Sequence, residues 1–177
     1  MKPTILTAGG KYFNFLQPAA DTVEIETIAH ALSNICRYTG HVREFYSVAQ
    51  HSVLVSFLVP PEHALAGLLH DAAEAFIGDV AAPLKRLLPD YKVIEQRVEA
   101  VVLAKFGLPA ELPICVKLAD MVALATEQRD LMPAHDDIWA SIEGVQPDDL
   151  VTVPHSPKYA KTLFLQRFYE LMQKVPA

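Results

Sequence analysis

The chain has 177 residues, of which 51% are hydrophobic and 20% are charged. These values are typical of a globular protein, and the length suits one domain with its own core, so we expect a single domain over residues 1–177. The formal net charge of −6 argues against non-specific binding of nucleic acid, which needs a broad basic surface.

The apolar runs fall short of the roughly 20 residues that a membrane-spanning helix needs. The run over residues 48–59, for example, is interrupted by polar residues at 50–52. The first residues do not have the sustained apolar stretch of a secretory signal. Cys36 and Cys115 lie far apart without Cys-x-x-Cys spacing, which fits free thiols in a reducing compartment. We therefore expect a cytoplasmic protein without a membrane partner.

The N-terminal part of the chain predicts a short hairpin followed by a helix. Residues 1–20 contain a glycine pair at 9–10 between stretches with aliphatic and aromatic residues, which indicates a hairpin or extended arm. Asp21, with Glu24 three residues later, resembles a capping box. Apolar residues then recur at helical spacing, and this pattern ends at Gly40.

The middle of the chain predicts three helices. Ser47, three residues before a glutamine, indicates a second capping box and a helix over residues 48–59. A pair of prolines ends that helix and starts the next, which we expect over residues 61–77. Asp79 is expected to cap a short helix over residues 79–88.

Further helices are predicted over residues 89–106, 113–132 and 156–174. The tract over residues 133–157, which contains several prolines and acidic residues, is expected to be irregular. No alternation of polar and apolar residues is long enough to build a central sheet. The predicted fold class is therefore all-α, a helical bundle with a small N-terminal hairpin or arm.

Five ionisable residues lie within the apolar helices, where an unpaired charge or imidazole costs free energy. His70, Asp71 and Glu74 have spacings that place them on one side of a helix. His51 and Asp120 are each expected to be the most buried ionisable group of their helix. A single histidine in such a setting is usually a hydrogen-bonded core residue, but packing explains the joint pattern less easily. Two imidazoles and two carboxylates suit a transition metal better than calcium or magnesium alone.

The chain resembles the HD-domain metal-dependent phosphohydrolases over about residues 25–175. Their H…HD…D signature is matched, in this order, by His51, the His70-Asp71 pair and Asp120. The resemblance implies an HD-domain helical bundle. It is closer to the bacterial 5'-deoxynucleotidases and the phage dATP triphosphohydrolases of that family, and the matching parts are residues 35–38, Arg43, residues 48–52, residues 70–74 and residues 78–85. These branches imply a homo-oligomer, either a dimer or a hexamer.

The resemblance also implies a metal site and two catalytic residues. His51, His70, Asp71 and Asp120 would bind one divalent transition metal, namely zinc, manganese or cobalt, with magnesium at an additional site. Glu74 and Asp79 would position or deprotonate the attacking water. The alternatives are that Asp79 only caps a helix and that Glu74 lies on a solvated helix face.

The substrate residues are likewise implied by the resemblance. Arg37 matches the arginine that contacts phosphate, and Tyr38 stands where the deoxynucleotidases have an aromatic residue that helps to exclude a ribose 2'-hydroxyl. Arg43 and Lys85 are further candidates for binding the phosphates of a longer substrate. Pro83 belongs to the same matched segment and is assigned to the substrate pocket.

We therefore expect a metal-dependent phosphohydrolase of deoxynucleotides. A dNTP, with dATP included, is the first candidate substrate, because the three cations exceed what one phosphate requires. The alternatives are a 5'-deoxynucleotidase that acts on dNMPs and a nucleotide-sensing HD domain without turnover, which the presence of Glu74 and Asp79 disfavours. A ribonuclease or a cyclic-dinucleotide phosphodiesterase is a weaker alternative, since the acidic chain offers no RNA track.

Overall fold

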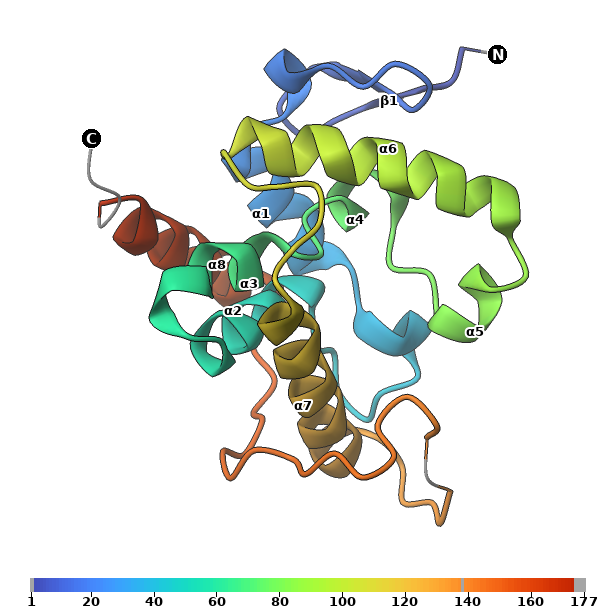
Figure 1. Ribbon diagram of the computed structural model, residues 1–177, viewed down its shortest axis with the longest axis vertical. Coiled ribbons are helices and arrows are strands. Elements are labelled where there is room, and N and C mark those ends of the chain that lie inside the picture. Colours follow the sequence, from blue (N-terminus) through green and yellow to red (C-terminus); the bar gives the residue numbers. More distant parts are fainter. Residues whose placement is uncertain (1, 138, 174–177) are drawn as a thin grey trace.

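A computed structural model describes residues 2–137 and 139–173 and is mostly helical, as predicted (Figure 1). The N-terminal hairpin is confirmed. Its strands β1 (Thr4–Leu6) and β2 (Tyr12–Asn14) are antiparallel, with Ile5 opposite Phe13. Phe13 is fully buried and stacks on Phe76, with 4.0 Å between the ring centroids. The hairpin is thereby tied to the helical core.

The α-helices follow the predicted order, with short 3-10 turns at Ala20–Thr22, Arg37–Gly40 and Pro61–His63. In the part of the chain that the structure describes, no helix is both long and apolar enough to span a bilayer. Position 174 of the predicted last helix lies outside the described residues. The helices are α1 (Ile25–Asn34), α2 (Val48–Leu58), α3 (Ala64–Leu69), α4 (Glu74–Ile77), α5 (Ala82–Lys85), α6 (Pro89–Lys105), α7 (Ile114–Leu131) and α8 (Pro157–Met172).

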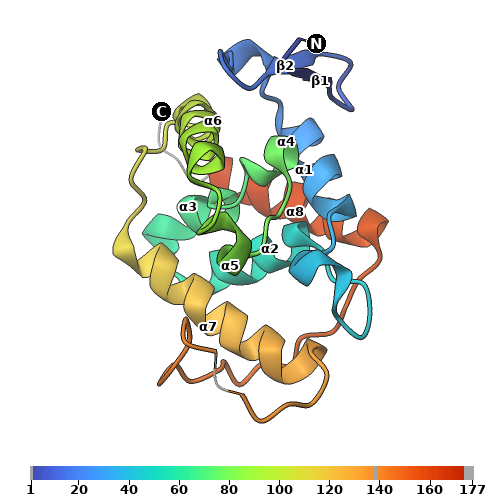
Figure 2. The ribbon, with the colours of Figure 1, turned by 90° about the vertical axis from the view of Figure 1, so that its right-hand side faces the viewer.

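Helix α2 packs against α1, α3, α7 and α8. It begins as predicted, because the hydroxyl of Ser47 accepts a hydrogen bond from the backbone N–H of Gln50 at 3.2 Å. Helix α6 lies near the hairpin, whereas α7 lies at the opposite end of the molecule in both views (Figures 1 and 2). Residues of α2 therefore lie between the hairpin and α7.

Two predicted helix caps are wrong. Asp21 lies within a 3-10 turn, and α1 begins only after Glu24, whose carboxylate pairs with the ammonium group of Lys11 at 2.8 Å. Asp79 does not cap α5, since the residue before that helix is Ala81. The chain leaves α4 through Gly78 at a φ of +81°, a conformation that favours glycine, and has no regular secondary structure until α5 begins at Ala82. The Asp79 carboxyl is therefore not used as a cap.

The helix predicted over residues 61–77 is interrupted. After α3 ends at Leu69, the chain makes a turn over residues 70–73 before α4 begins. The backbone N–H of Ala72 bonds to the carbonyl of Leu69, and that of Glu74 to the carbonyl of Asp71, each at 3.0 Å. Both bonds span three residues, as in a 3-10 helix. The His70-Asp71 pair therefore lies in a tightened turn.

The described residues between α7 and α8, 132–137 and 139–156, are irregular as predicted, and we call them the connecting segment. It follows α7 and returns to α8 (Figure 2). The guanidinium of Arg129 on α7 donates to the carbonyls of Asp148 and Leu150, at 2.8 and 2.7 Å. The side chain of Gln50 donates to the carbonyl of Val153 at 2.7 Å. Polar contacts, rather than regular backbone pairing, thus attach this segment.

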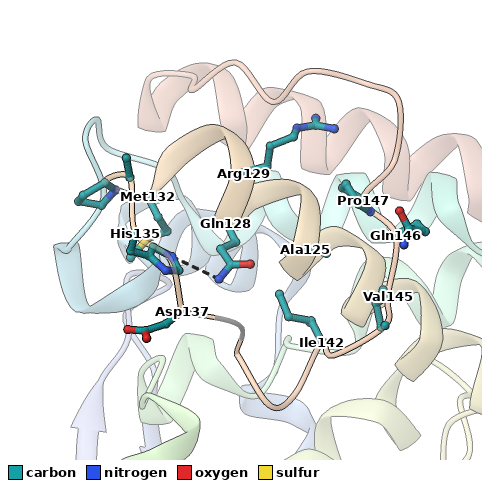
Figure 3. Close-up of a pocket in the computed structure, with 13 residues that line it drawn as sticks. Ala125, Gln128, Arg129, Met132, His135, Asp137, Ile142, Val145, Gln146 and Pro147 are labelled. Atoms are coloured by element: carbon teal, nitrogen blue, oxygen red, sulfur yellow. Dashed lines mark hydrogen bonds between the residues drawn. The ribbon is translucent and has the colours of Figure 1, made fainter.

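A cavity of about 390 Å³ separates part of the connecting segment from α7 (Figure 3). Gln128 and His135 line it and lie within hydrogen-bond distance, with 3.3 Å between their side-chain nitrogens. The residues predicted for the site do not line this cavity.

Candidate metal centre

All four predicted metal ligands converge, from α2, from the turn after α3 and from α7. The Nε2 atom of His51 lies 3.3 Å from Nε2 of His70 and 3.2 Å from Oδ1 of Asp120. The Oδ2 atom of Asp71 lies 3.2 Å from Nε2 of His70 and 3.5 Å from Nε2 of His51. The ligand atoms of His51, His70 and Asp120 all lie within 4.8 Å of one another, close enough to hold one metal ion.

The remaining nitrogen of each imidazole is occupied by an acceptor. Nδ1 of His51 lies 2.6 Å from Oε1 of Glu127, and Nδ1 of His70 lies 2.8 Å from the carbonyl oxygen of Gly67. Because an ionised carboxylate and a backbone carbonyl only accept hydrogen bonds, both Nδ1 atoms carry a proton. In the neutral imidazole, Nε2 therefore carries a lone pair. This lone pair is directed toward the point where the four predicted ligands converge, as in histidines that bind metals.

The converging atoms require a cation. Two imidazole lone pairs and two carboxylates meet at this point, which is unfavourable unless a metal ion or protons lie between them. Without a metal, protons on the imidazole nitrogens supply the positive charge. Burial and Arg37 favour the neutral imidazole of His51, but Glu127 and Asp120 outweigh them and raise its pKa to about 10. Burial also acts against ionisation of Asp71, but His70 and His51 hold the pKa of Asp71 well below its usual value. The donor set fits a divalent metal.

Glu127 is a residue of the candidate site that was not predicted from the sequence. Asp120 was expected to be the most buried ionisable group of α7, but its side chain is 39% exposed, whereas that of Glu127 is 0% exposed. Glu127 follows Asp120 by seven residues, or about two helical turns, which places both side chains on one face of α7. That spacing within an apolar helix was the signal that could have identified it.

The Glu127 carboxylate also holds two predicted substrate residues. Its Oε2 atom accepts from Nε of Arg37 at 3.0 Å and from the hydroxyl of Tyr38 at 2.7 Å. Burial raises the pKa of the Glu127 carboxyl, but Arg37 and His51 outweigh this effect and hold it at about 2. Tyr38 and Thr39 have positive φ angles of 56° and 54°, a strained conformation typical of functional sites.

A cavity of about 540 Å³ opens beside the metal ligands. Asp71 and Asp120 line it, while the two histidines do not. It contains both predicted catalytic residues and most of the predicted substrate residues. The further residues of its wall are Arg37, Tyr38, Thr39, Glu74, Asp79, Val80, Ala81, Ala82, Pro83, Lys85, Arg86, Leu124, Trp139, Ala140 and Ser141.

Glu74 and Asp79 are two carboxyl groups with raised pKa values at this cavity. Glu74 is buried rather than solvated, and its Oε2 atom has no hydrogen-bond partner among the described residues. Burial raises the pKa of Glu74 well above its usual value, and repulsion from Asp71 and Asp79 acts in the same direction. Burial also raises the pKa of Asp79, although Arg37 opposes this effect. Such groups are typical acid or base catalysts.

The structure brings Arg37 and Lys85 to the cavity, but not Arg43. The guanidinium of Arg43 donates to the carbonyl of Asp130 at 2.5 Å, so this side chain binds the end of α7 instead. The ammonium group of Lys85 lies 2.6 Å from a carboxylate oxygen of Glu95 and 3.5 Å from one of Glu74. Arg86, which the sequence analysis did not single out, is an additional cation in the cavity wall.

Comparison with known proteins identifies relatives that match nearly the whole chain. No family model matches it. The chain is 46% identical over 170 residues to the uncharacterized protein YfdR of Escherichia coli, an alignment that covers 96% of each protein. It is 36% identical over 184 residues to an uncharacterized protein of Rhodobacter capsulatus, with 94% of each covered. Identity at this level over nearly full length indicates a shared fold.

Proposed function

Because the chain belongs to the same family as the Escherichia coli protein YfdR, whose name specifies no activity, we propose a function from the site itself. The protein is a metal-dependent phosphohydrolase of the HD-domain type that acts on deoxynucleotides. The observation that carries this proposal is the convergence of the His51 and His70 lone pairs on the carboxylates of Asp71 and Asp120. This cluster adjoins a cavity that contains the raised-pKa carboxyls of Glu74 and Asp79.

In this proposal His51, His70, Asp71 and Asp120 bind the metal. A set of two nitrogens and two carboxylates favours zinc, manganese or cobalt, with magnesium at an additional site. A divalent metal in such a site supplies Lewis-acid chemistry, since it acidifies water and withdraws charge from phosphoryl oxygens. The protein contributes oriented imidazoles, because Glu127 and Gly67 fix their Nδ1 protons.

The cavity residues position the reactants and move the proton. Glu74 and Asp79 would together position the attacking water, and one of the two would accept its proton, a role that a raised carboxyl pKa suits near neutral pH. Arg37 binds a phosphoryl oxygen through its guanidinium, while the Nε–H of the same guanidinium donates to the Glu127 carboxylate. Tyr38, fixed by the same carboxylate, lies against the sugar and disfavours a 2'-hydroxyl, although such a wall discriminates only modestly.

A dNTP is the first candidate substrate, with deoxynucleoside and triphosphate as products. Arg37, Lys85 and Arg86 all line the cavity, so three cations remain available to a polyphosphate even though Arg43 lies elsewhere. A dNMP is the second candidate. It is favoured by the pairing of Arg37 with Glu127 and of Lys85 with Glu95, because both cations are already partly neutralised.

Product analysis tests the proposal and separates the two substrates. Purified protein is incubated with manganese, cobalt or magnesium and a panel of dNTPs, dNMPs and ribonucleotides, and the products are resolved by ion-exchange chromatography. Deoxynucleoside with triphosphate, absent for an Asp71→Ala variant, supports the first candidate. Deoxynucleoside with orthophosphate from dNMPs supports the second. If no nucleotide is turned over with any metal, the proposed function is wrong.

A further inference from the structure

The connecting segment contributes the only tryptophan of the chain to the wall of the large cavity. Trp139 lies between α7 and α8 in the sequence, far from the metal ligands of α2. It is partly buried, and it lines the cavity together with Ala140 and Ser141. The ring is placed at the cavity rather than in the main hydrophobic cluster, which does not include Trp139.

The Trp139 indole lies near two other aromatic rings. The centroids of the Trp139 and Tyr38 rings lie 5.9 Å apart with 49° between the planes. The His135 imidazole is nearly parallel to the indole, with 5.8 Å between centroids and 8° between planes. Both distances are within the range of direct aromatic contact, so no planar group fits between these rings. A planar ligand in the cavity would therefore lie against Trp139 and Tyr38 rather than between them.

The wall that these two rings form faces a cavity with a charged part. Asp71 and Asp120 belong to the metal cluster, and Arg37 and Lys85 supply positive charge at the same cavity. A volume of about 540 Å³ is ample for a nucleotide. A phosphate group therefore has cations to bind, and a planar apolar group has an aromatic surface. This combination matches the two ends of a nucleotide.

We propose that Trp139, together with Tyr38, is the subsite for the nucleobase, so that the connecting segment selects nucleotides over small phosphate esters. This inference rests on the proposed function, since it assumes that the phosphate end lies at the metal cluster. Stacking on an aromatic face tolerates every base, and a purine offers more surface than a pyrimidine. The subsite therefore favours purine deoxynucleotides and does not read one base exclusively.

Tryptophan fluorescence tests the subsite without a measurement of activity. Since the chain has a single tryptophan, its emission reports on Trp139 alone. In a Glu74→Gln background, which should slow turnover at least about 100-fold, dAMP with magnesium should change the emission saturably. Deoxyribose 5-phosphate and inorganic phosphate, which have no base, should leave it unchanged. An equal response to dAMP and to inorganic phosphate, or no response to dAMP, would overturn the proposal.

Kinetics then separate this proposal from the proposed function. Trp139→Ala should lower kcat/KM for a purine deoxynucleotide at least about tenfold, but leave hydrolysis of deoxyribose 5-phosphate unchanged, and Trp139→Tyr should restore part of the loss. Tyr12→Ala, which removes an exposed aromatic ring of the hairpin, is the matched control. Equal losses of kcat/KM for the purine deoxynucleotide and for deoxyribose 5-phosphate would mean that Trp139 has only a structural role. If Trp139→Ala leaves hydrolysis of the deoxynucleotide unaffected, only the nucleobase subsite is overturned. If dAMP changes the tryptophan emission but no nucleotide is hydrolysed, only the proposed hydrolase activity is overturned.

Discussion

The Nδ1 atom of His51 lies 2.6 Å from Oε1 of Glu127, and both side chains are fully buried. The second oxygen of the same carboxylate accepts from Arg37 and Tyr38. One buried group therefore connects an imidazole of the metal cluster with two residues of the substrate cavity. A change at Glu127 should consequently affect both metal binding and substrate binding, although this residue lines neither the cavity nor the metal centre.

Glu127→Gln should weaken metal binding about 10- to 100-fold. The amide lacks the charge that holds the Nδ1 proton of His51, and it leaves Arg37 without its buried counter-ion. Competition with a chelating dye measures the affinity. Glu111→Gln, an exposed change before α7, is the matched control and should have no effect. Equal affinities for the two variants would show that Glu127 does not orient the imidazole.

The low pKa of Glu127 predicts a dependence of stability on pH. Although burial raises this pKa, Arg37 and His51 lower it to about 2, below the usual 4.5. Folding thus favours the ionised form, so the stabilisation is complete above about pH 4.5 and is lost as the pH falls toward 2. Over this interval the chelator-treated protein should lose on the order of 3 kcal/mol of unfolding free energy relative to Glu127→Gln. Urea unfolding of both proteins measures the difference, and a constant difference would contradict the prediction.

Asp120→Ala should abolish stabilisation by metal while leaving the apo protein folded. The Asp120 side chain is 39% exposed, so its removal leaves no deep cavity, and it also relieves repulsion with Asp71. With metal at about 100 times its Kd, the wild type should gain about 2.7 kcal/mol, or roughly 5–10 °C in Tm. Thermal unfolding with and without metal tests this, with Asp90→Ala as the exposed control on α6. A metal-induced rise in the Asp120→Ala variant would exclude Asp120 as a ligand.

Gly67→Ala should disturb the metal centre through the backbone. An added Cβ would lie 3.0 Å from a methyl group of Val59, 3.1 Å from Cα of Ser56 and 3.2 Å from the carbonyl oxygen of Val55. Because two of these contacts are backbone atoms, α3 must move away from α2. We expect a loss of about 1–3 kcal/mol in unfolding free energy and weaker metal binding, since the Gly67 carbonyl accepts from His70. Calorimetry measures both quantities, and unchanged values would show that the helices adjust without cost.

Glu74→Gln should reduce kcat at least about 100-fold and leave metal affinity intact. The amide preserves the shape of this buried side chain but cannot accept a proton from water. Steady-state kinetics, together with a metal titration of the same sample, test the role. Glu99→Gln on α6 is the control. If kcat were retained with full metal occupancy, the base would have to be another group, with Asp79 the next to test.

Local signals along the chain determined the fold class, the hairpin and most of the helices. The Ser47 cap and the prolines that begin α6 and α8 act within a few residues, so their effects are readable from the sequence. The metal candidates were readable for a similar reason, since a charge or imidazole within an apolar helix is costly unless it has a partner. The HD-domain assignment, the substrate and the metal's identity remain predictions.

Only the tertiary structure decided how the site is assembled. The tightened turn at residues 70–73 interrupts a predicted continuous helix, and Asp79 does not cap the helix for which it was predicted. Glu127 reaches His51 across 76 positions of the chain, and Trp139 comes to the cavity from an irregular segment. Local propensity contains no information about such contacts, because they depend on how α2, α7 and the connecting segment pack. The sequence determined which groups needed partners, and packing decided which partners they have.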